Sequence, residues 1–110
     1  MGCPTVNGNF NCSYNSLISL EGCPVHNVTD FSCNSNELTS LKGCPVVIDG
    51  SFDCGTNKLD SLVGCPIKVG GEFSCYDNKL FSLIGCPMIV GGSFYCMNNK
   101  FIIRMFIKCW

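Results

Sequence analysis

Apolar and polar residues recur along this chain with a period of about 21 residues. Each unit starts with Gly-Cys-Pro, at residues 2, 22, 43, 64 and 85, and continues with Phe, Cys and Asn. An aliphatic residue precedes the Phe in every unit but the second, which has Asn27, and two Leu follow the Asn in every unit but the last, which has Phe101 and Arg104. The unit can be written Gly-Cys-Pro-x-x-Val-x-Gly-x-Phe-x-Cys-x-x-Asn-x-Leu-x-x-Leu-x. Self-similarity at such a period indicates a solenoid, in which each unit buries its apolar side chains against the next.

The Phe-x-Cys part of each unit predicts a short strand. Its alternation has a period of two, so Phe and Cys point to one face and their neighbours point to the other. Strands stacked at about 4.8 Å per unit would form a parallel sheet along one side of the coil. The residues between successive strands include Gly, Pro and Asn, so we expect an extended or single-turn return without helices.

The chain is therefore predicted to be one β-rich solenoid domain, residues 1–110, with one short parallel strand per repeat. The repeats span residues 2–21, 22–42, 43–63, 64–84 and 85–101, and residues 102–110 are expected to form a C-terminal cap strand. Asn recurs at one position of every unit. It predicts a ladder of buried amides that bond the backbone of adjacent turns, since unpaired backbone groups would cost about 1–3 kcal/mol each.

The run Phe-x-Cys-x-x-Asn-x-Leu-x-x-Leu resembles the core of the leucine-rich-repeat family, with Phe and Cys at its two strand positions. The short period and the Pro resemble the bacterial-type class, and the cysteine content is similar to repeats in phage and large-virus proteins. The resemblance covers residues 2 to about 101. It implies a right-handed horseshoe coil that binds other macromolecules through its concave strand face. The chain has fewer repeats than most family members and lacks a separate N-terminal cap, so we expect a shallow arc.

On this chain the resemblance implies a protein-binding face at the outward positions beside each Phe and Cys. The candidate residues of this face are Tyr14, Asp30, Asp53, Glu72, Tyr76, Asp77, Tyr95 and Met97.

Composition and charge narrow the class of partner. The 46% hydrophobic content argues against disorder, and seven basic residues against eight acidic ones, with Lys spread along the chain, argue against nucleic acid. No stretch approaches the roughly 18 apolar residues of a membrane span. The N-terminus lacks the basic stretch and apolar core of a secretory signal, so we expect neither membrane insertion nor export by that route.

Eleven cysteines leave three interpretations open: buried thiols, disulfides or metal ligands. Metal is the weakest, because zinc sites favour Cys-x2–4-Cys knuckles and the spacings from Cys12 to Cys96 alternate between 11 and 10 residues. Buried thiols would fit a reducing cytoplasm, whereas disulfides would fit an extracellular location. Disulfides within repeats, starting with Cys3–Cys12, would leave Cys109 as a spare thiol, whereas disulfides between repeats, starting with Cys12–Cys23, would leave Cys3. Either scheme places the spare thiol at one end of the solenoid.

The last nine residues break the repeat, since Arg104 stands where the final Leu should be. As a cap they would place Ile103, Met105 and Ile107, with Phe101, over the open core. Alternatively they form a docking surface for another subunit. The expected assembly ends are Cys3, Phe106, Cys109 and Trp110.

These features favour a non-enzymatic protein-binding solenoid without cofactor, metal or catalytic residues. One concrete version is a virus- or phage-encoded inhibitor of a host protein. The alternative is a structural solenoid that self-associates head to tail into fibres or oligomers, because bare solenoid ends expose strand edges. His26 is the only histidine and has no implied partner, so a solvated role is favoured over catalysis.

Overall fold

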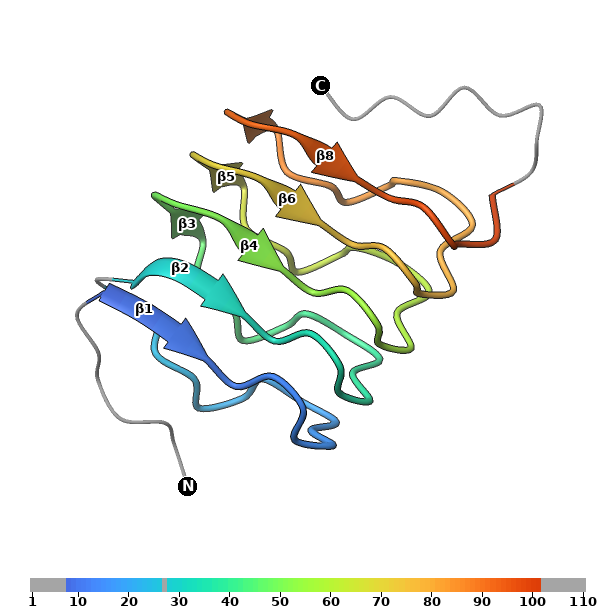
Figure 1. Cartoon of the computed structure of the whole chain (residues 1–110), viewed down its shortest axis with the longest axis horizontal. Helices are drawn as coiled ribbons and strands as arrows, with labels where there is room; N and C mark the ends of the chain where they lie inside the picture. Colours follow the sequence, from blue (N-terminus) through green and yellow to red (C-terminus); the bar gives the residue numbers. More distant parts are fainter. Residues whose placement is uncertain (1–7, 27, 102–110) are drawn as a thin grey trace.

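The structure, a computed structural model, describes residues 8–26 and 28–101, which form a solenoid of parallel strands. Five strands make a front sheet (Figure 1), in the order β1 (Gly8–Asn11), β2 (Val28–Ser32), β4 (Phe52–Asp53), β6 (Phe73–Ser74) and β8 (Phe94–Tyr95). Three strands make a back sheet, in the order β3 (Val47–Ile48), β5 (Lys68–Val69) and β7 (Ile89–Val90). No helix occurs among the described residues.

The strands pair one repeat apart, so that each Phe of the front sheet lies beside the Phe of the next repeat. Between β4 and β6, for example, the N–H of Phe52 donates to the carbonyl of Glu72 at 2.9 Å. The first unit is one residue shorter than the others, and this difference is taken up in β1. Gly8 pairs with Val28 while Phe10 pairs with Phe31, so the register shifts between them.

The predicted β-rich solenoid without helices is confirmed for the described residues. The return side is more regular than expected. Three of the turns each contain a second short strand, and these three strands form the back sheet. In each of these strands one residue points inward, as with the fully buried Ile48, and its neighbour Val47 faces outward. Two-residue strands are too short for an alternating pattern to reveal them in the sequence.

Stacked phenylalanines form the centre of the core. Their ring centroids are 5.0–5.7 Å apart from one turn to the next, from Phe10 to Phe94, within the range for favourable aromatic pairs. In the middle turns, the side chains of the Phe column, of the Cys column two residues after it and of both Leu columns are essentially inaccessible to solvent. Each of these core residues is therefore covered by its equivalents in the adjacent turns, as a solenoid requires.

The recurring Asn forms the predicted ladder. The Asn57 Oδ1 atom accepts from the N–H of Leu38 at 2.9 Å, and Nδ2 donates to the carbonyls of Cys33, Cys54 and Gly55, each at 3.1 Å. The equivalent asparagines repeat most of this pattern from Asn36 to Asn99. Each amide thus bonds the backbone of both its own turn and the preceding one.

Two backbone features let the chain turn tightly at every repeat. The residue before each ladder Asn has a left-handed conformation, with φ between 52° and 60°; these residues are Tyr14, Ser35, Thr56, Asp77 and Asn98. The Gly of each described Gly-Cys-Pro also has positive φ, for example 96° at Gly64. A Cβ on Gly64 would lie 3.0 Å from the backbone nitrogen of Lys42, so this glycine also permits close packing of adjacent turns.

Candidate functional site

The outward strand face, meaning the outward-pointing side chains of the front sheet, has an internally bonded polar half. The Ser13 and Ser32 hydroxyls lie 2.8 Å apart, and the Asn34 amide donates to Ser32 Oγ at 2.9 Å and to Asp53 Oδ2 at 3.1 Å. Asp53 Oδ1 also accepts the N–H of Gly55 at 2.8 Å. Hydrogen bonds within the protein thus occupy many of the polar groups in these first three turns.

The last two turns present aromatic and thioether side chains on the same face. Tyr76 and Met97 hold the same position in successive turns, and Tyr95 lies on β8 two residues before Met97. The Tyr76 ring lies over Gly55, where any Cβ would overlap it. Gly55 therefore provides a flat seat for the ring. Tyr95 is 38% exposed and Met97 60% exposed.

The structure separates the aromatic and Met residues of the predicted face. It brings Tyr76, Tyr95 and Met97 together on adjacent turns, whereas Tyr14 is strongly exposed on the first turn, at the other end of the stack.

The acidic residues of the predicted face mostly bond other turns. Asp30 Oδ1 accepts the N–H of Ser51 at 2.7 Å, and Asp77 Oδ2 accepts the Thr56 hydroxyl at 3.2 Å. Glu72 is exposed. The predicted assembly ends Cys3, Phe106, Cys109 and Trp110 lie outside the described residues.

Two columns of cysteines run side by side through the coil. The column two residues after each Phe includes Cys54, whose thiol donates to the carbonyl of Ser74 at 3.4 Å. In the column after each Gly, the thiols of Cys44 and Cys65 donate to the carbonyls of Gly64 and Gly85 at 3.0 and 2.9 Å. These S–H bonds connect adjacent turns, so the thiols contribute to the stacking as well as filling space.

Burial lowers the reactivity of these thiols by raising their pKa. Burial, helped at Cys44 and Cys75 by neighbouring thiols, raises the pKa of Cys44, Cys65 and Cys75 to about 12. Burial also raises the pKa of Cys33 and Cys54 well above the ordinary value. The thiolate is both the nucleophile and the metal ligand, so these residues are poor candidates for either role. Among the described residues, no group of three or more His, Cys, Asp or Glu is arranged to hold a metal ion.

The return side presents an apolar surface that sequence analysis missed. The residue after Pro in the second to fifth repeats forms an exposed column, here called the apolar return column: Val25, Val46, Ile67 and Met88, which are 45–74% exposed. Aligned repeats could have revealed it, because four of the five residues at this position are apolar, with Thr5 as the exception. Val47 and Ile89 of the back sheet lie next to it and are also exposed.

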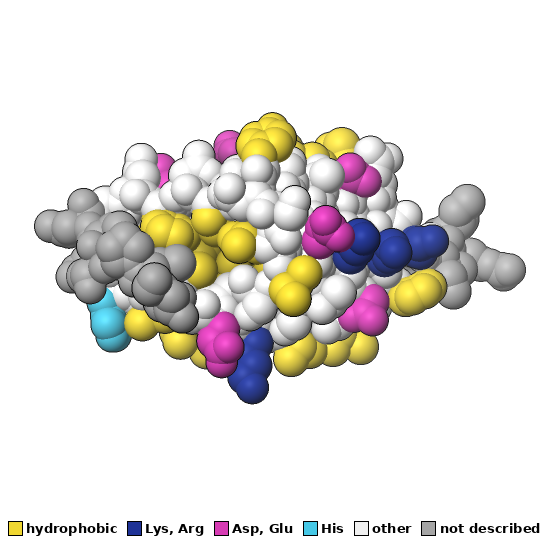
Figure 2. Space-filling view, turned by 90° about the horizontal axis from the view of Figure 1, so that it is seen from below, with side chains coloured by type: hydrophobic (Ala, Val, Ile, Leu, Met, Phe, Trp, Pro, Cys, Tyr) yellow, Lys and Arg dark blue, Asp and Glu magenta, His cyan; other side chains and the backbone are white. Residues whose placement is uncertain are grey.

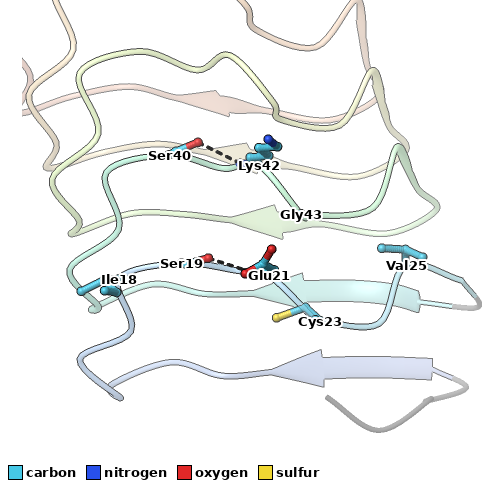
Figure 3. Close-up of a pocket in the computed structure, with 9 residues that line it drawn as sticks. Ile18, Ser19, Glu21, Cys23, Val25, Ser40, Lys42 and Gly43 are labelled. Carbon is cyan, nitrogen blue, oxygen red and sulfur yellow. Dashed lines mark hydrogen bonds between the residues drawn. The ribbon is translucent and has the colours of Figure 1, made fainter. Parts of the chain in front are cut away.

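Between the first two turns the return side is hollowed into a shallow groove (Figure 3). Ile18 and Val25 line it together with Glu21 and Lys42. Its serines have a structural role, because Ser19 Oγ accepts the N–H of Glu21 and the same bond recurs in later turns. One acidic and one basic side chain at its rim suggest no particular ligand.

Lysines that are scattered in the sequence come together in one column. Lys58, Lys79 and Lys100 occupy the same position in successive turns, and Figure 2 shows a row of basic side chains on this surface. Lys58 pairs with Glu37 of the preceding turn at 3.3 Å, with both side chains about half exposed, and Asp60 and Asp77 lie two positions away on either side of the column. The acidic neighbours reduce the field of this row, so it makes a weak site for a polyanion.

No helix in the described part of the chain is long and apolar enough to cross a membrane. Comparison with protein-family models, with curated proteins and with solved structures finds no match for this chain.

Proposed function

We propose that this chain is a non-catalytic solenoid that binds a protein through the outward strand face of its last two turns. The observation that supports it is the group formed by Tyr76, Tyr95 and Met97, which stand on the front sheet beside polar groups that are largely bonded within the protein. Aromatic residues and Met are enriched in protein interfaces, and Tyr is frequent among the residues that dominate binding energy.

The resemblance to leucine-rich repeats favours the same surface, since that family binds macromolecules on its strand face. A virus- or phage-encoded inhibitor of a host protein is one version of this proposal. It rests on the similarity of the cysteine-rich repeats alone, and the surface itself names no target.

The test compares two variants of the full chain against one partner. The first carries Tyr76→Ala, Tyr95→Ala and Met97→Ala; the matched control carries Val46→Ser, Ile67→Ser and Met88→Ser on the return side. Loss of one dominant contact costs about 2 kcal/mol or more, which is roughly a 30-fold weakening. The proposal expects calorimetry to show such a loss for the first variant only. Unchanged affinity for the first variant, with loss for the control, would move the site to the return side.

A second candidate is self-association through the return side, and the apolar return column favours it. Four exposed apolar side chains in register, with Val47 and Ile89 beside them, form a larger apolar surface than isolated residues would. Sedimentation velocity over a hundredfold concentration range separates the candidates. A concentration-independent monomer supports binding of another protein. Association that the return-side control variant abolishes supports assembly.

A further inference from the structure

Charge is unevenly distributed over this nearly neutral chain. Of the five lysines in the described ranges, Lys68 lies on the back sheet and Lys42 lines the return groove. The other three form the lysine column, which directly follows the ladder Asn and lies past the edge of the front sheet. The outward strand face, in contrast, holds no basic side chain among these residues and carries four carboxylates, those of Asp30, Asp53, Glu72 and Asp77.

These carboxylates are not neutralised within the described part of the chain. Its one ion pair joins Lys58 to Glu37, away from this face. Asp77 Oδ2 accepts the Thr56 hydroxyl at 3.2 Å, whereas Asp77 Oδ1 and the exposed Glu72 carboxylate accept no hydrogen bond from that part. A surface with charges of a single sign attracts partners of the opposite sign and repels the others. The face therefore favours a positively charged partner.

The aromatic side chains of the face lie among these carboxylates. Tyr76 directly precedes Asp77, and its ring lies over Gly55, two residues after Asp53. Tyr95 belongs to the same column as Asp53, two strands away. A guanidinium can stack on a tyrosine ring and at the same time donate hydrogen bonds to a carboxylate, so this combination of groups suits arginine side chains.

We propose that the partner presents an extended, arginine-bearing segment to the outward strand face, with one guanidinium on the Tyr76 ring and its N–H groups donating to Asp77. This inference rests on the proposed function and names the chemistry of its partner. Alternate side chains of an extended segment point to one side, about 7 Å apart, so a further arginine of the segment can reach Glu72. Tyr95 and Met97 contact the apolar stems of the arginines, which remain available when the charged ends are paired.

A pair of synthetic peptides tests the requirement for positive charge. Fluorescence anisotropy measures binding of the full chain to labelled Arg-Thr-Arg-Thr-Arg-Thr-Arg with blocked ends, and to the same peptide with citrulline, a neutral analogue, in place of Arg. We expect the citrulline peptide to bind at least tenfold more weakly, and the affinity for the arginine peptide to fall as salt is added. Equal affinities, or no binding of the arginine peptide at millimolar concentration, would overturn the inference.

Two charge-matched variants test the position of the site. Glu72→Gln with Asp77→Asn removes two charges from the face, whereas Glu21→Gln with Asp49→Asn removes two from exposed positions elsewhere. Both variants have the same net charge, so a difference between them reports position. We expect the first to bind the arginine peptide roughly tenfold more weakly and the second to bind it almost unchanged.

Equal weakening in both variants would assign the binding to overall charge and overturn the inference. The aromatic triple variant of the proposed function separates the two proposals. If it alone loses affinity for the partner, while both charge variants keep theirs, the face remains a binding site and recognition of arginine is excluded. If the face variants leave partner binding intact, the proposed function fails as well.

Discussion

At the scale of single residues, the ladder asparagines connect the turns most directly. Asn57 bonds four backbone groups in two turns, and its side chain is buried. Asn15, in the first turn, is exposed, and among the described residues its amide donates to the carbonyls of Cys12 and Ser13.

Replacing Asn57 with Ala should therefore lower the free energy of unfolding by about 3 kcal/mol or more, since each buried backbone group left unpaired costs about 1–3 kcal/mol. Asn15→Ala should cost distinctly less, because water can replace its bonds. Urea denaturation of the two variants measures the difference. Equal costs would mean that the ladder contributes little to stacking.

Thr56 has a backbone conformation that is unfavourable for its residue type. It is β-branched, yet its φ is 52°, where β-branched residues are rare and Asn is enriched. The equivalent residue one turn before the end of the stack is Asp77, and in the last turn it is Asn98, with φ values of 57° and 58°.

We expect Thr56→Asn to stabilise the protein by about 0.5–1 kcal/mol, and Asn98→Thr to destabilise it by a similar amount. Thermal unfolding of the two variants checks both signs. Destabilisation by Thr56→Asn would show that the bond from the Thr56 hydroxyl to Asp77 outweighs the backbone preference.

At the scale of the elements, the front strands could be predicted from sequence because each Phe-x-Cys recurs five times with an apolar face. The back sheet could not, since β3, β5 and β7 have two residues each and depend on pairing with equivalent residues of adjacent turns. The same limit applies to the candidate site. Aligned columns placed Tyr76 and Met97 together, but nothing local showed that Gly55 seats the Tyr76 ring or that Asp30 would bond Ser51.

The cysteine columns predict how stability depends on pH. Thiols in the unfolded chain ionise near pH 9, whereas Cys44 and Cys75 in the folded protein keep their protons to about pH 12. Above pH 9 the folded state thus binds more protons than the unfolded state, so the free energy of unfolding must fall as pH rises towards 12. Below pH 9 both states are protonated and this contribution is constant.

Urea denaturation at several pH values from 8 to about 11 measures this slope. Cys75→Ala should show a shallower fall than the unmodified protein, with Lys and Tyr ionisation common to both. Identical slopes would mean that the thiol ionises as readily in the folded protein as in the unfolded chain.

At the scale of the whole molecule, a single arrangement explains the columns of Phe, Leu, Cys and Asn. Each becomes buried or bonded only when successive repeats lie in register, one turn above the other. The repeat spacing predicted this arrangement from sequence. The exposed columns were harder to interpret, because the apolar return column and the lysine column become surfaces only after the turns are stacked.

Scalar couplings across hydrogen bonds, measured by NMR, test this register most directly. The account predicts couplings from the amide nitrogens of Phe31, Phe52 and Phe73 to the carbonyl carbons of Ser51, Glu72 and Ser93, the acceptors one turn further along the chain. Couplings to residues at any other spacing, or amides in these strands that exchange freely with solvent, would contradict the in-register solenoid and the surfaces inferred from it.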